Sequence, residues 1–277
     1  MRKLVNYLND FLKAIGAISS FITIIWAIFS SQSSSLVNTS PLLFLLFIFV
    51  TAIIYSLFIN RSKGKIELSL SDKVKAKVFF GDLFESKEII VIPVNEYFDT
   101  IVDDKIISSN TLHGKFIQKF FSENKDELTN QIKKNLEQYT PLEINKKRKL
   151  GNTYKYDLGT VCEVKNNDKI FYLVALTKFN NNHRAVVSNS EYQKVLCALL
   201  SYIEQNSQGR KVNIPLIGAG QSGVSLKKQK LLEFLLFSIH LENNLTLING
   251  VNIILHESAQ EDIDLSLTEV LFKNIGT

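Results

Sequence analysis

Hydrophobic and polar positions divide the chain into two regions. Residues 14–29 (AIGAISSFITIIWAIF) and 41–59 (PLLFLLFIFVTAIIYSLFI) are uncharged and largely apolar, and the second run approaches the ~20 residues that a helix needs to cross a bilayer. This pattern predicts a transmembrane hairpin over residues 1–60, with spans at about 11–30 and 41–59. Basic residues flank the hairpin and its linker is uncharged, so both termini are expected to be cytoplasmic. A cleaved signal peptide is the alternative.

From residue 61 onwards the pattern alternates between strand-like and helix-like stretches. We expect a linker and a first short strand over 61–74, followed by a domain over 75–277. Strands are predicted at about 65–70, 75–80, 88–94, 158–164, 169–177, 211–217 and 251–256, and helices at about 113–121, 123–138, 189–205, 226–241 and 262–272. Several strands are continuous apolar runs, which suit a sheet covered by helices on both faces. The predicted fold class is α/β with one mixed sheet.

Composition excludes several classes of protein. Nineteen Phe and only four Pro in 277 residues argue against disorder. Cys162 and Cys197 form no metal or redox motif, and the histidines have no metal-ligand spacing, so no metal site is expected. The net charge of +5 does not predict nucleic-acid binding, and the basic run 146–149 is most simply a solvated loop, with a phosphate or lipid contact as the alternative.

The most informative stretch is IPLIGAGQSGV, residues 214–224. A strand ends there in a glycine-rich turn, whose backbone N–H groups can converge on an anion without a Cβ in the way. The predicted phosphate cradle comprises Gly218, Ala219, Gly220, Gln221, Ser222 and Gly223. A plain strand-to-helix turn is the alternative. A Rossmann dinucleotide site is disfavoured, because that motif belongs on the first strand of its sheet.

Two earlier strand ends complete a pattern. Gly81, Asp82 and Leu83 follow the strand ending at Phe80, and Asn95 follows the strand 88–94. The order of Gly-Asp, Val-Asn and a late Ile-Gly-Ala-Gly-x-x-Gly resembles the macro domain, a three-layer α/β/α fold that binds ADP-ribose. The resemblance implies that Asp82 accepts from adenine, Asn95 lies beside the distal ribose, and residues 218–223 hold the diphosphate. From the residues alone, the alternatives are a helix N-cap for Asp82 and a turn residue for Asn95.

Further contacts are less specific. Lys178 and Phe179 end another strand and are expected to add a phosphate contact and a stacking ring, and Thr111 and His113 lie in the loop SSNTLHG, residues 108–114. This loop departs from the glycine-rich loop of hydrolytic macro domains. Asp99, Asp103, Asp104 or His113 are the candidates for water activation or acid–base chemistry. We expect no catalytic residue and no cofactor, and binding rather than catalysis.

A hairpin followed by this type of macro domain resembles the membrane-anchored effectors of the Thoeris anti-phage defence system, the macro-type ThsA family. The resemblance implies a protein of the bacterial inner membrane that detects a nucleotide made from NAD by a TIR-domain partner. The implied ligand is an ADP-ribose derivative, histidine-linked ADP-ribose in the macro type. Binding would drive homo-oligomerisation, contact with membrane lipid and membrane disruption, ending in cell death or growth arrest.

Two other classes of function remain open from the sequence. The acidic loop and His113 suit a membrane-tethered ADP-ribosyl hydrolase or an NAD-consuming enzyme. A passive tether that holds an ADP-ribosylated partner at the bilayer is the third class. Turnover of NAD or of an ADP-ribosylated substrate by the protein would distinguish the enzyme from the two binding functions.

Overall fold

The computed structural model describes residues 11–19, 22, 46, 49–54, 63–180, 184–220, 224–242 and 244–273. The chain divides into two compact units, Met1–Ser62 and Lys63–Thr277. The second unit contains the whole sheet, and its first strand begins at Lys65, within the segment predicted as a linker and short strand.

The predicted transmembrane hairpin and inner-membrane location are contradicted by the structure. Among the described residues, no helix combines the length and the apolar character needed to cross a bilayer. In the first unit the described helical residues are 11–19, 22, 46 and 49–54. The rest of the predicted spans lies outside the described residues.

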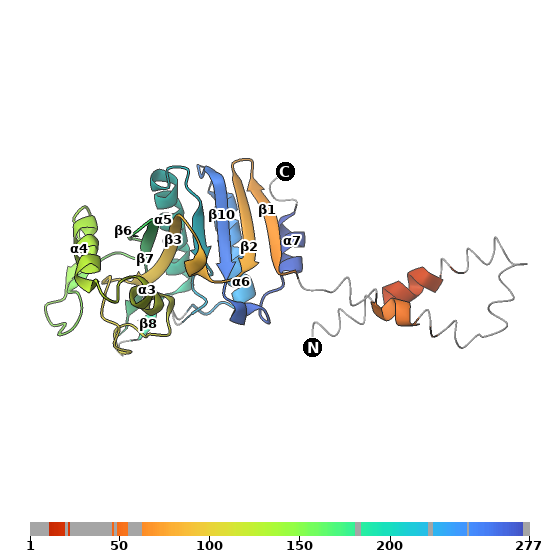
Figure 1. Cartoon of the computed structure of the whole chain (residues 1–277), viewed down its shortest axis with the longest axis horizontal. Helices are drawn as coiled ribbons and strands as arrows, with labels where there is room; N and C mark the ends of the chain where they lie inside the picture. Colours follow the sequence, from red (N-terminus) through yellow and green to blue (C-terminus); the bar gives the residue numbers. More distant parts are fainter. Residues whose placement is uncertain are drawn as a thin grey trace, which may run out of the picture. The chain divides into compact units, whose positions relative to one another are not determined.

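The described part of the second unit contains an eight-stranded mixed sheet (Figure 1). The strand order is β1 (Lys65–Ser71), β2 (Val74–Phe80), β10 (Leu247–Leu255), β9 (Val212–Pro215), β3 (Ile89–Asn95), β7 (Lys169–Phe179) and β6 (Val161–Asn166), and β8 (Ala185–Val186) pairs with β7. The five strands β2, β10, β9, β3 and β7 run parallel to one another, and β1, β6 and β8 are antiparallel to the strands with which they pair. The carboxyl ends of the five parallel strands therefore meet at one edge.

Period-two alternation explains why the central strands are apolar throughout. In β3, Ile89 and Val91 enter one hydrophobic core, whereas Ile90 and Ile92 enter the other. Strand β7 alternates in the same way along its length. Successive side chains of a strand point to opposite faces, so a strand covered on both faces needs hydrophobic residues at every position.

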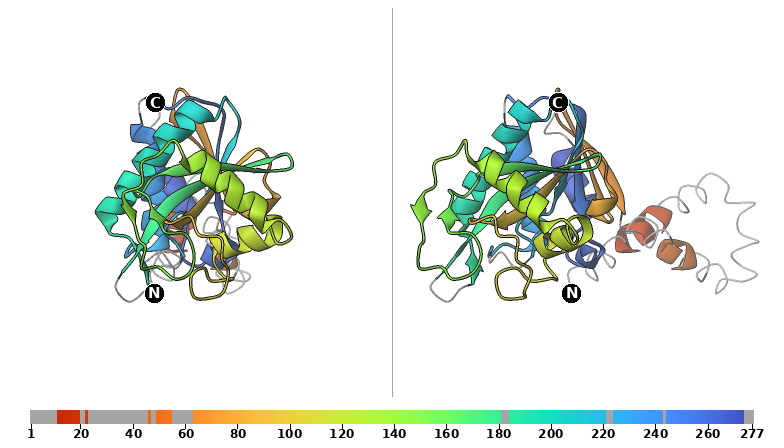
Figure 2. Two further views of the ribbon diagram at one scale, coloured as in Figure 1. Left: turned by 90° about the vertical axis from the view of Figure 1, so that its left-hand side faces the viewer. Right: turned by 60° about the vertical axis from the view of Figure 1, so that its left-hand side comes forward.

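Helices cover both faces of the sheet, which confirms the predicted three-layer α/β/α domain (Figure 2). One core contains side chains of α3 (Leu112–Phe120), α4 (Lys125–Leu136) and the short helix η1 (Leu83–Glu85). The other contains side chains of α5 (Asn189–Asn206), α6 (Lys228–Leu241), η2 (Glu257–Ala259) and α7 (Leu265–Phe272). Helix α5 begins with a capping box, in which Ser188 and Glu191 satisfy each other's backbone N–H groups.

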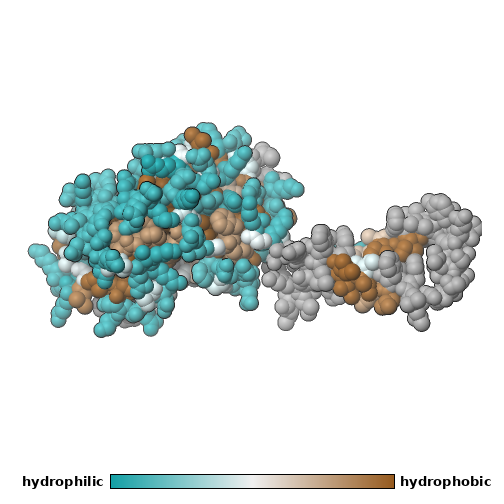
Figure 3. All heavy atoms as spheres, viewed as in Figure 1, coloured by the Kyte–Doolittle hydropathy of each residue, from teal (hydrophilic) through white to brown (hydrophobic). Residues whose placement is uncertain are grey.

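A short antiparallel pair interrupts the regular pattern between α4 and β6. It consists of β4 (Glu143–Ile144) and β5 (Tyr154–Lys155). We call residues 143–155 the strap. In the space-filling view, the visible surface of the second unit is mostly hydrophilic (Figure 3), as expected for a domain whose apolar side chains fill the two cores.

Candidate functional site

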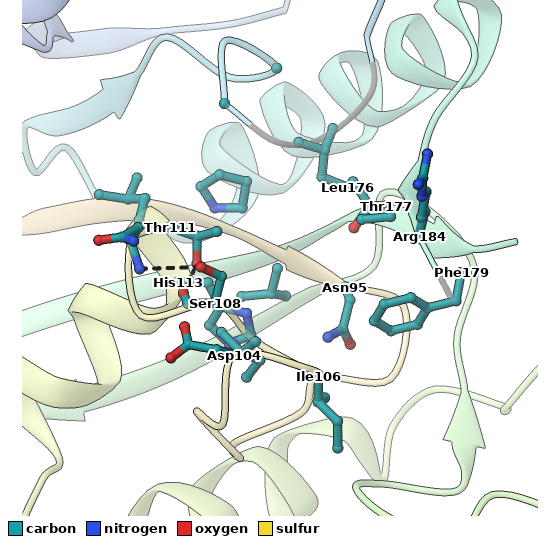
Figure 4. Close-up of a pocket in the computed structure, with 18 of the residues that line it drawn as sticks. Asn95, Asp104, Ile106, Ser108, Thr111, His113, Leu176, Thr177, Phe179 and Arg184 are labelled. Carbon is teal, nitrogen blue, oxygen red and sulfur yellow. Dashed lines mark hydrogen bonds between the residues drawn. The ribbon is translucent and has the colours of Figure 1, made fainter. Parts of the chain in front are cut away.

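A cleft of about 510 Å³ lies at the carboxyl ends of β3, β7 and β9. Its walls come from those strand ends, from the segment 104–113 that leads into α3, and from the β8 region (Figure 4). Ligands of open α/β sheets bind in the crevice at this edge, because strands and helices end there and loops converge. Asn95, Thr111, His113, Phe179, Gly218 and Gly220 are the predicted site residues that line it.

The loop after β9 supplies two glycines to the cleft. Gly218 has φ of +87°, and a Cβ there would lie 3.0 Å from Val224 and 3.2 Å from Tyr192, so glycine is required by both backbone and packing. Gly220 faces open space, since an added Cβ would meet no atom within 4 Å. Ala219 is in this loop but does not line the cleft, and its N–H is donated to Leu216 O. Gln221, Ser222 and Gly223 lie outside the described residues.

Asn95 ends β3 and is buried. Its side-chain oxygen accepts from the backbone N–H groups of Tyr97 at 3.0 Å and Asp99 at 3.4 Å. Asn95 is therefore a turn residue, as one reading of the sequence proposed. Its Nδ2 donates to no acceptor among the described residues. The Nδ2 hydrogens are therefore available to a ligand in the cleft that Asn95 lines.

The amino terminus of α3 forms a second wall. Thr111 caps the helix by accepting from Gly114 N at 3.1 Å, and its hydroxyl donates to Ser108 O at 2.7 Å. His113 follows within the first turn and is buried. Burial lowers the pKa of His113 to about 3, while the backbone of Asp99 opposes the shift. The imidazole is therefore neutral at physiological pH.

The end of β7 contributes Thr177 and Phe179 to the cleft, and Arg184 enters it from the start of β8 (Figure 4). Lys178, predicted to contact phosphate, does not line the cleft. It forms an ion pair with Glu191 at the start of α5, which raises the pKa of Lys178 and lowers that of Glu191 to about 2. The Lys178 ammonium group is therefore paired with the carboxylate of Glu191 in α5.

The end of β2 places Gly81, Asp82 and Leu83 at the same edge of the sheet, outside the cleft lining. The Asp82 carboxylate caps η1 by accepting from Phe84 N at 2.9 Å, and one oxygen lies 3.7 Å from Lys119 Nζ. Half of the Asp82 side chain remains exposed. Leu83 is buried in the core beneath η1. Asp82 thus has a capping role in this structure, with carboxylate surface left for a ligand.

The basic run 146–149 contains one residue that is not solvated. Arg148 donates to both carboxylate oxygens of Asp99, at 2.7 and 2.6 Å, and its guanidinium lies 4.0 Å from the centre of the Tyr97 ring. Asp99 is completely buried and also accepts from Asn152 N at 2.8 Å. A Cβ at Gly151 would lie 2.3 Å from Asp99 Oδ1, so glycine is needed for this close approach. These contacts fasten the strap beside the end of β3.

Other carboxylates near the cleft are held by local structure. Asp103 accepts from the backbone N–H groups of Lys105 and Ile106, and Asp104 accepts from the N–H and hydroxyl of Ser109. These hydrogen bonds lower the pKa of both carboxylates. Within the described ranges no cluster of three metal-ligating side chains occurs. The candidate acids of the sequence are therefore structural acceptors here.

The sequence analysis did not predict that Arg148 pairs with a buried carboxylate or that Arg184 lines the cleft. The chain has five arginines, at positions 2, 61, 148, 184 and 210, among 32 basic residues. Arg presents a planar fork of donors that Lys lacks, and it is preferred for bidentate and stacked contacts. In a chain that uses Lys almost everywhere, an Arg in a loop was the available signal for a specific contact.

Comparisons with known proteins agree on the domain. The family model described as "Thoeris protein ThsA, Macro domain" matches residues 76–256. A Thoeris protein ThsA from Bacillus amyloliquefaciens (strain Y2) is 35% identical over 179 residues, which are 63% of this chain and 57% of that protein. The matched region thus spans little more than half of that relative.

Solved structures show the same fold at low identity. A mutant macrodomain of Oceanobacillus iheyensis with ADPR superposes with a TM-score of 0.51 at 10% identity, covering 75% of this chain and 98% of that one. The Oceanobacillus iheyensis macrodomain with ADP gives a TM-score of 0.50 at 11% identity, covering 76% and 97%.

Proposed function

Since the chain belongs to the family of the Thoeris protein ThsA macro domain, we propose that its second unit binds ADP-ribose or a derivative of it and that this binding activates an anti-phage effector. The macrodomain structures from Oceanobacillus iheyensis contain ADPR in one case and ADP in another. The adenosine diphosphate part is the shared chemistry that we transfer to this chain.

The observation that carries the proposal is the order of chemical groups along the edge of the sheet. Strand order places Asp82 after β2, the Gly218–Gly220 turn after β9, and Asn95 after β3. A carboxylate that accepts from an amine, backbone donors for a diphosphate and an amide for a ribose therefore follow one another in space. This is the order of adenine, diphosphate and distal ribose in ADP-ribose.

Two electrostatic features of the cleft suit a diphosphate. Arg184 lines the cleft and forms no ion pair with any described residue. The amino terminus of α3 also meets the cleft through Thr111 and Leu112, where the helix dipole favours negative charge. Both features attract an anion electrostatically, and the glycine turn leaves space for it.

The same geometry favours binding over catalysis. A general acid or base works best with a pKa near the operating pH, whereas burial lowers the pKa of His113 to about 3. Asp99 is enclosed by Arg148 and Asn152. Asp103 and Asp104 accept backbone hydrogen bonds that close their own turns. The three aspartates are therefore committed to structural contacts, and His113 is kept neutral by burial.

The proposed signal is a nucleotide produced from NAD by a TIR-domain partner, with histidine-linked ADP-ribose as the ligand implied by the family. Binding acts as a switch only if it favours one arrangement of the protein over another. We propose that the favoured arrangement is a homo-oligomer, and that its formation ends in growth arrest or death of the infected cell.

Calorimetric titration of the full chain with ADP-ribose tests the binding step. Gly220→Val places a branched side chain in open space within the cleft, so the fold should persist while affinity falls at least tenfold. Gly64→Val is the matched control, because Gly64 also has no atom within 4 Å of an added Cβ and does not line the cleft. Equal affinities for both variants, or no binding by the unaltered chain, would refute the site.

Incubation with NAD and with an ADP-ribosylated substrate separates the alternative. The proposal predicts no release of nicotinamide or free ADP-ribose above background. Turnover that His113→Gln abolishes would instead identify a hydrolase or NAD-consuming enzyme and would replace the proposal of a pure binding site.

A further inference from the structure

A second cavity of about 840 Å³ adjoins the main cleft. Lys105, Ile106 and Phe179 line both cavities and form the partition between them. The far side of the second cavity is formed by the strap, through Glu143, Asn145, Lys147, Arg148, Lys149, Leu150 and Lys155. We call this space the strap cavity. A ligand that fills the main cleft near Asn95 ends beside this partition (Figure 4).

The partition is supported by aromatic packing. The rings of Tyr97 and Phe179 stack at 6.4 Å with 28° between their planes, and the Arg148 guanidinium lies over both, at 4.0 and 5.7 Å from the ring centres. Phe179 N also donates to the buried Glu96 carboxylate at 3.1 Å. This wall is thus held in place by contacts within the protein.

The strap cavity has an excess of positive charge. Its lining contains five cationic side chains and two carboxylates, and one of the cations, Arg148, is paired with Asp99. Glu96 and Glu143 both lie near Lys155, at 3.4 and 4.0 Å. Lys105, Lys147 and Lys149 form no ion pair in the part of the chain that the structure describes.

The position of one of these lysines is set by the fold of the strap. Asn145 accepts from Lys147 N through its side chain at 3.2 Å, and Asn145 N donates to Thr153 O at 2.9 Å. Asn145 also donates to the Tyr97 hydroxyl at 3.4 Å. Lys147 is therefore presented at the cavity by a turn that is fastened on both sides, whereas its neighbour Lys146 does not line the cavity.

From this arrangement we infer that the strap cavity receives an anionic group, a carboxylate or a phosphate, carried on the distal ribose of the nucleotide in the main cleft. The exposed ammonium groups of Lys105 at the partition and of Lys147 and Lys149 on the strap favour a negatively charged group in this cavity. The inference rests on the proposed function, because the main cleft must hold the nucleotide first. It defines the class of the ligand beyond ADP-ribose itself.

Two matched pairs of ligands test this inference on the full chain by calorimetry. ADP-ribose 1″-phosphate differs from ADP-ribose by a phosphate at the distal ribose, and nicotinic acid adenine dinucleotide differs from NAD by a carboxylate in place of an amide. We expect at least one anionic member to bind fivefold or more tightly than its partner, and the pair that responds identifies phosphate or carboxylate as the source.

Charge reversal locates the preference. Lys147→Glu should reduce the ratio of affinities within the responding pair to about one, whereas Lys146→Glu, with the same change of charge in the same run, should leave the ratio as it was. Added salt should also lower the ratio, since screening weakens exposed charge interactions.

The outcomes separate the two levels of argument. Binding of ADP-ribose without preference in either pair, or a preference that Lys147→Glu leaves intact, overturns the anionic subsite while the proposed function stands. Failure of the unaltered chain to bind any of the four nucleotides overturns both.

Discussion

Replacement of Asp99 by alanine should release the strap from the end of β3. The Asp99 carboxylate is completely buried and accepts from both terminal nitrogens of Arg148, at 2.7 and 2.6 Å, and from Asn152 N. Alanine removes all three acceptor contacts. The Arg148 side chain is only 14% exposed, so water cannot replace the carboxylate without movement of the strap.

The expected loss of unfolding free energy is about 3 kcal/mol. Removal of one partner of a buried ion pair costs roughly 3–5 kcal/mol, and the lower end applies because Arg148 keeps the Asn152 carbonyl and the Tyr97 ring. Arg148→Met should cost at least about 3 kcal/mol, because it leaves the fully buried Asp99 carboxylate without its cation, and this includes ~0.5–1 kcal/mol from the lost cation–π contact. The double variant should cost less than the sum of the two single variants by at least about 1 kcal/mol, because the residues are in direct contact.

Urea denaturation followed by far-UV circular dichroism measures these values. Tryptophan fluorescence is unsuitable, because the only tryptophan, Trp26, precedes the second unit. Hydrogen exchange over 145–153 reports the strap directly and should accelerate in Asp99→Ala. Glu123→Ala, at an exposed position, is the control and should change stability by less than about 0.5 kcal/mol. If Asp99→Ala matches this control, or exchange in the strap is unchanged, the buried clamp does not stabilise the fold as argued.

Three further predictions concern titration and the glycine turn. Burial lowers the pKa of His113 to about 3 in the folded protein, whereas an unfolded histidine has a pKa of ~6.5, so protonation favours the unfolded chain. The free energy of unfolding should therefore decline as pH falls from about 6.5 to 3. Urea titrations of His113→Gln over this range should show a shallower decline. The pKa of Glu191 is lowered to about 2 by Lys178 and Ser188. The ionised Glu191 should therefore contribute ~0.5–1 kcal/mol to the free energy of unfolding above pH ~4.3, and this contribution should be lost as pH falls to about 2. Thermal melts of Glu191→Gln that match the unaltered chain at pH 7 would contradict this. Gly218→Ala should lower the melting temperature, through strain equivalent to ~1 kcal/mol or more. Gly220→Ala should not lower it, because of the two glycines only Gly218 has a positive φ and close neighbours. Equal melting temperatures for the two variants would refute that distinction.

The hydrophobic pattern was sufficient to predict the regular elements of the second unit. The run EIIVIPV became β3, and FYLVALT lies within β7, because each supplies apolar side chains to both faces of the sheet. Helix α5 was predicted with its start at Asn189 and its end within one residue. The short strands β4, β5 and β8 were missed, since two residues are too few to establish a period.

The order of strands was not predictable in the same way. Local pattern determines that a segment is a strand, but pairing depends on contacts between distant segments. β9 and β10 lie between β2 and β3 in the sheet, although they follow both in the chain. The resemblance to macro domains implied that Asp82, Asn95 and the glycine turn share one site, but the strand order that places them along one edge comes from the structure.

The candidate site shows a similar division. Gly218, Gly220 and Asn95 carried local signals, because each is a turn-forming residue at the end of a strand. Arg148 and Arg184 carried none beyond their residue type. Lys178 had the expected charge for a phosphate contact, but the sequence did not reveal that Glu191 begins the adjacent helix within reach of it.

The position of β10 between β2 and β9 has a consequence for how the protein is made. In the described sheet β2 lies between β1 and β10, and β10 leaves the ribosome long after β2 has been synthesised. The first hairpin must wait for that late strand before it joins the sheet, so formation of the edge is a long-range closure of the kind that slows folding. An incomplete chain that lacks β10 therefore cannot place the end of β2 beside the ends of β9 and β3. On the proposed function, the growing chain would not respond to its nucleotide until synthesis has passed β10.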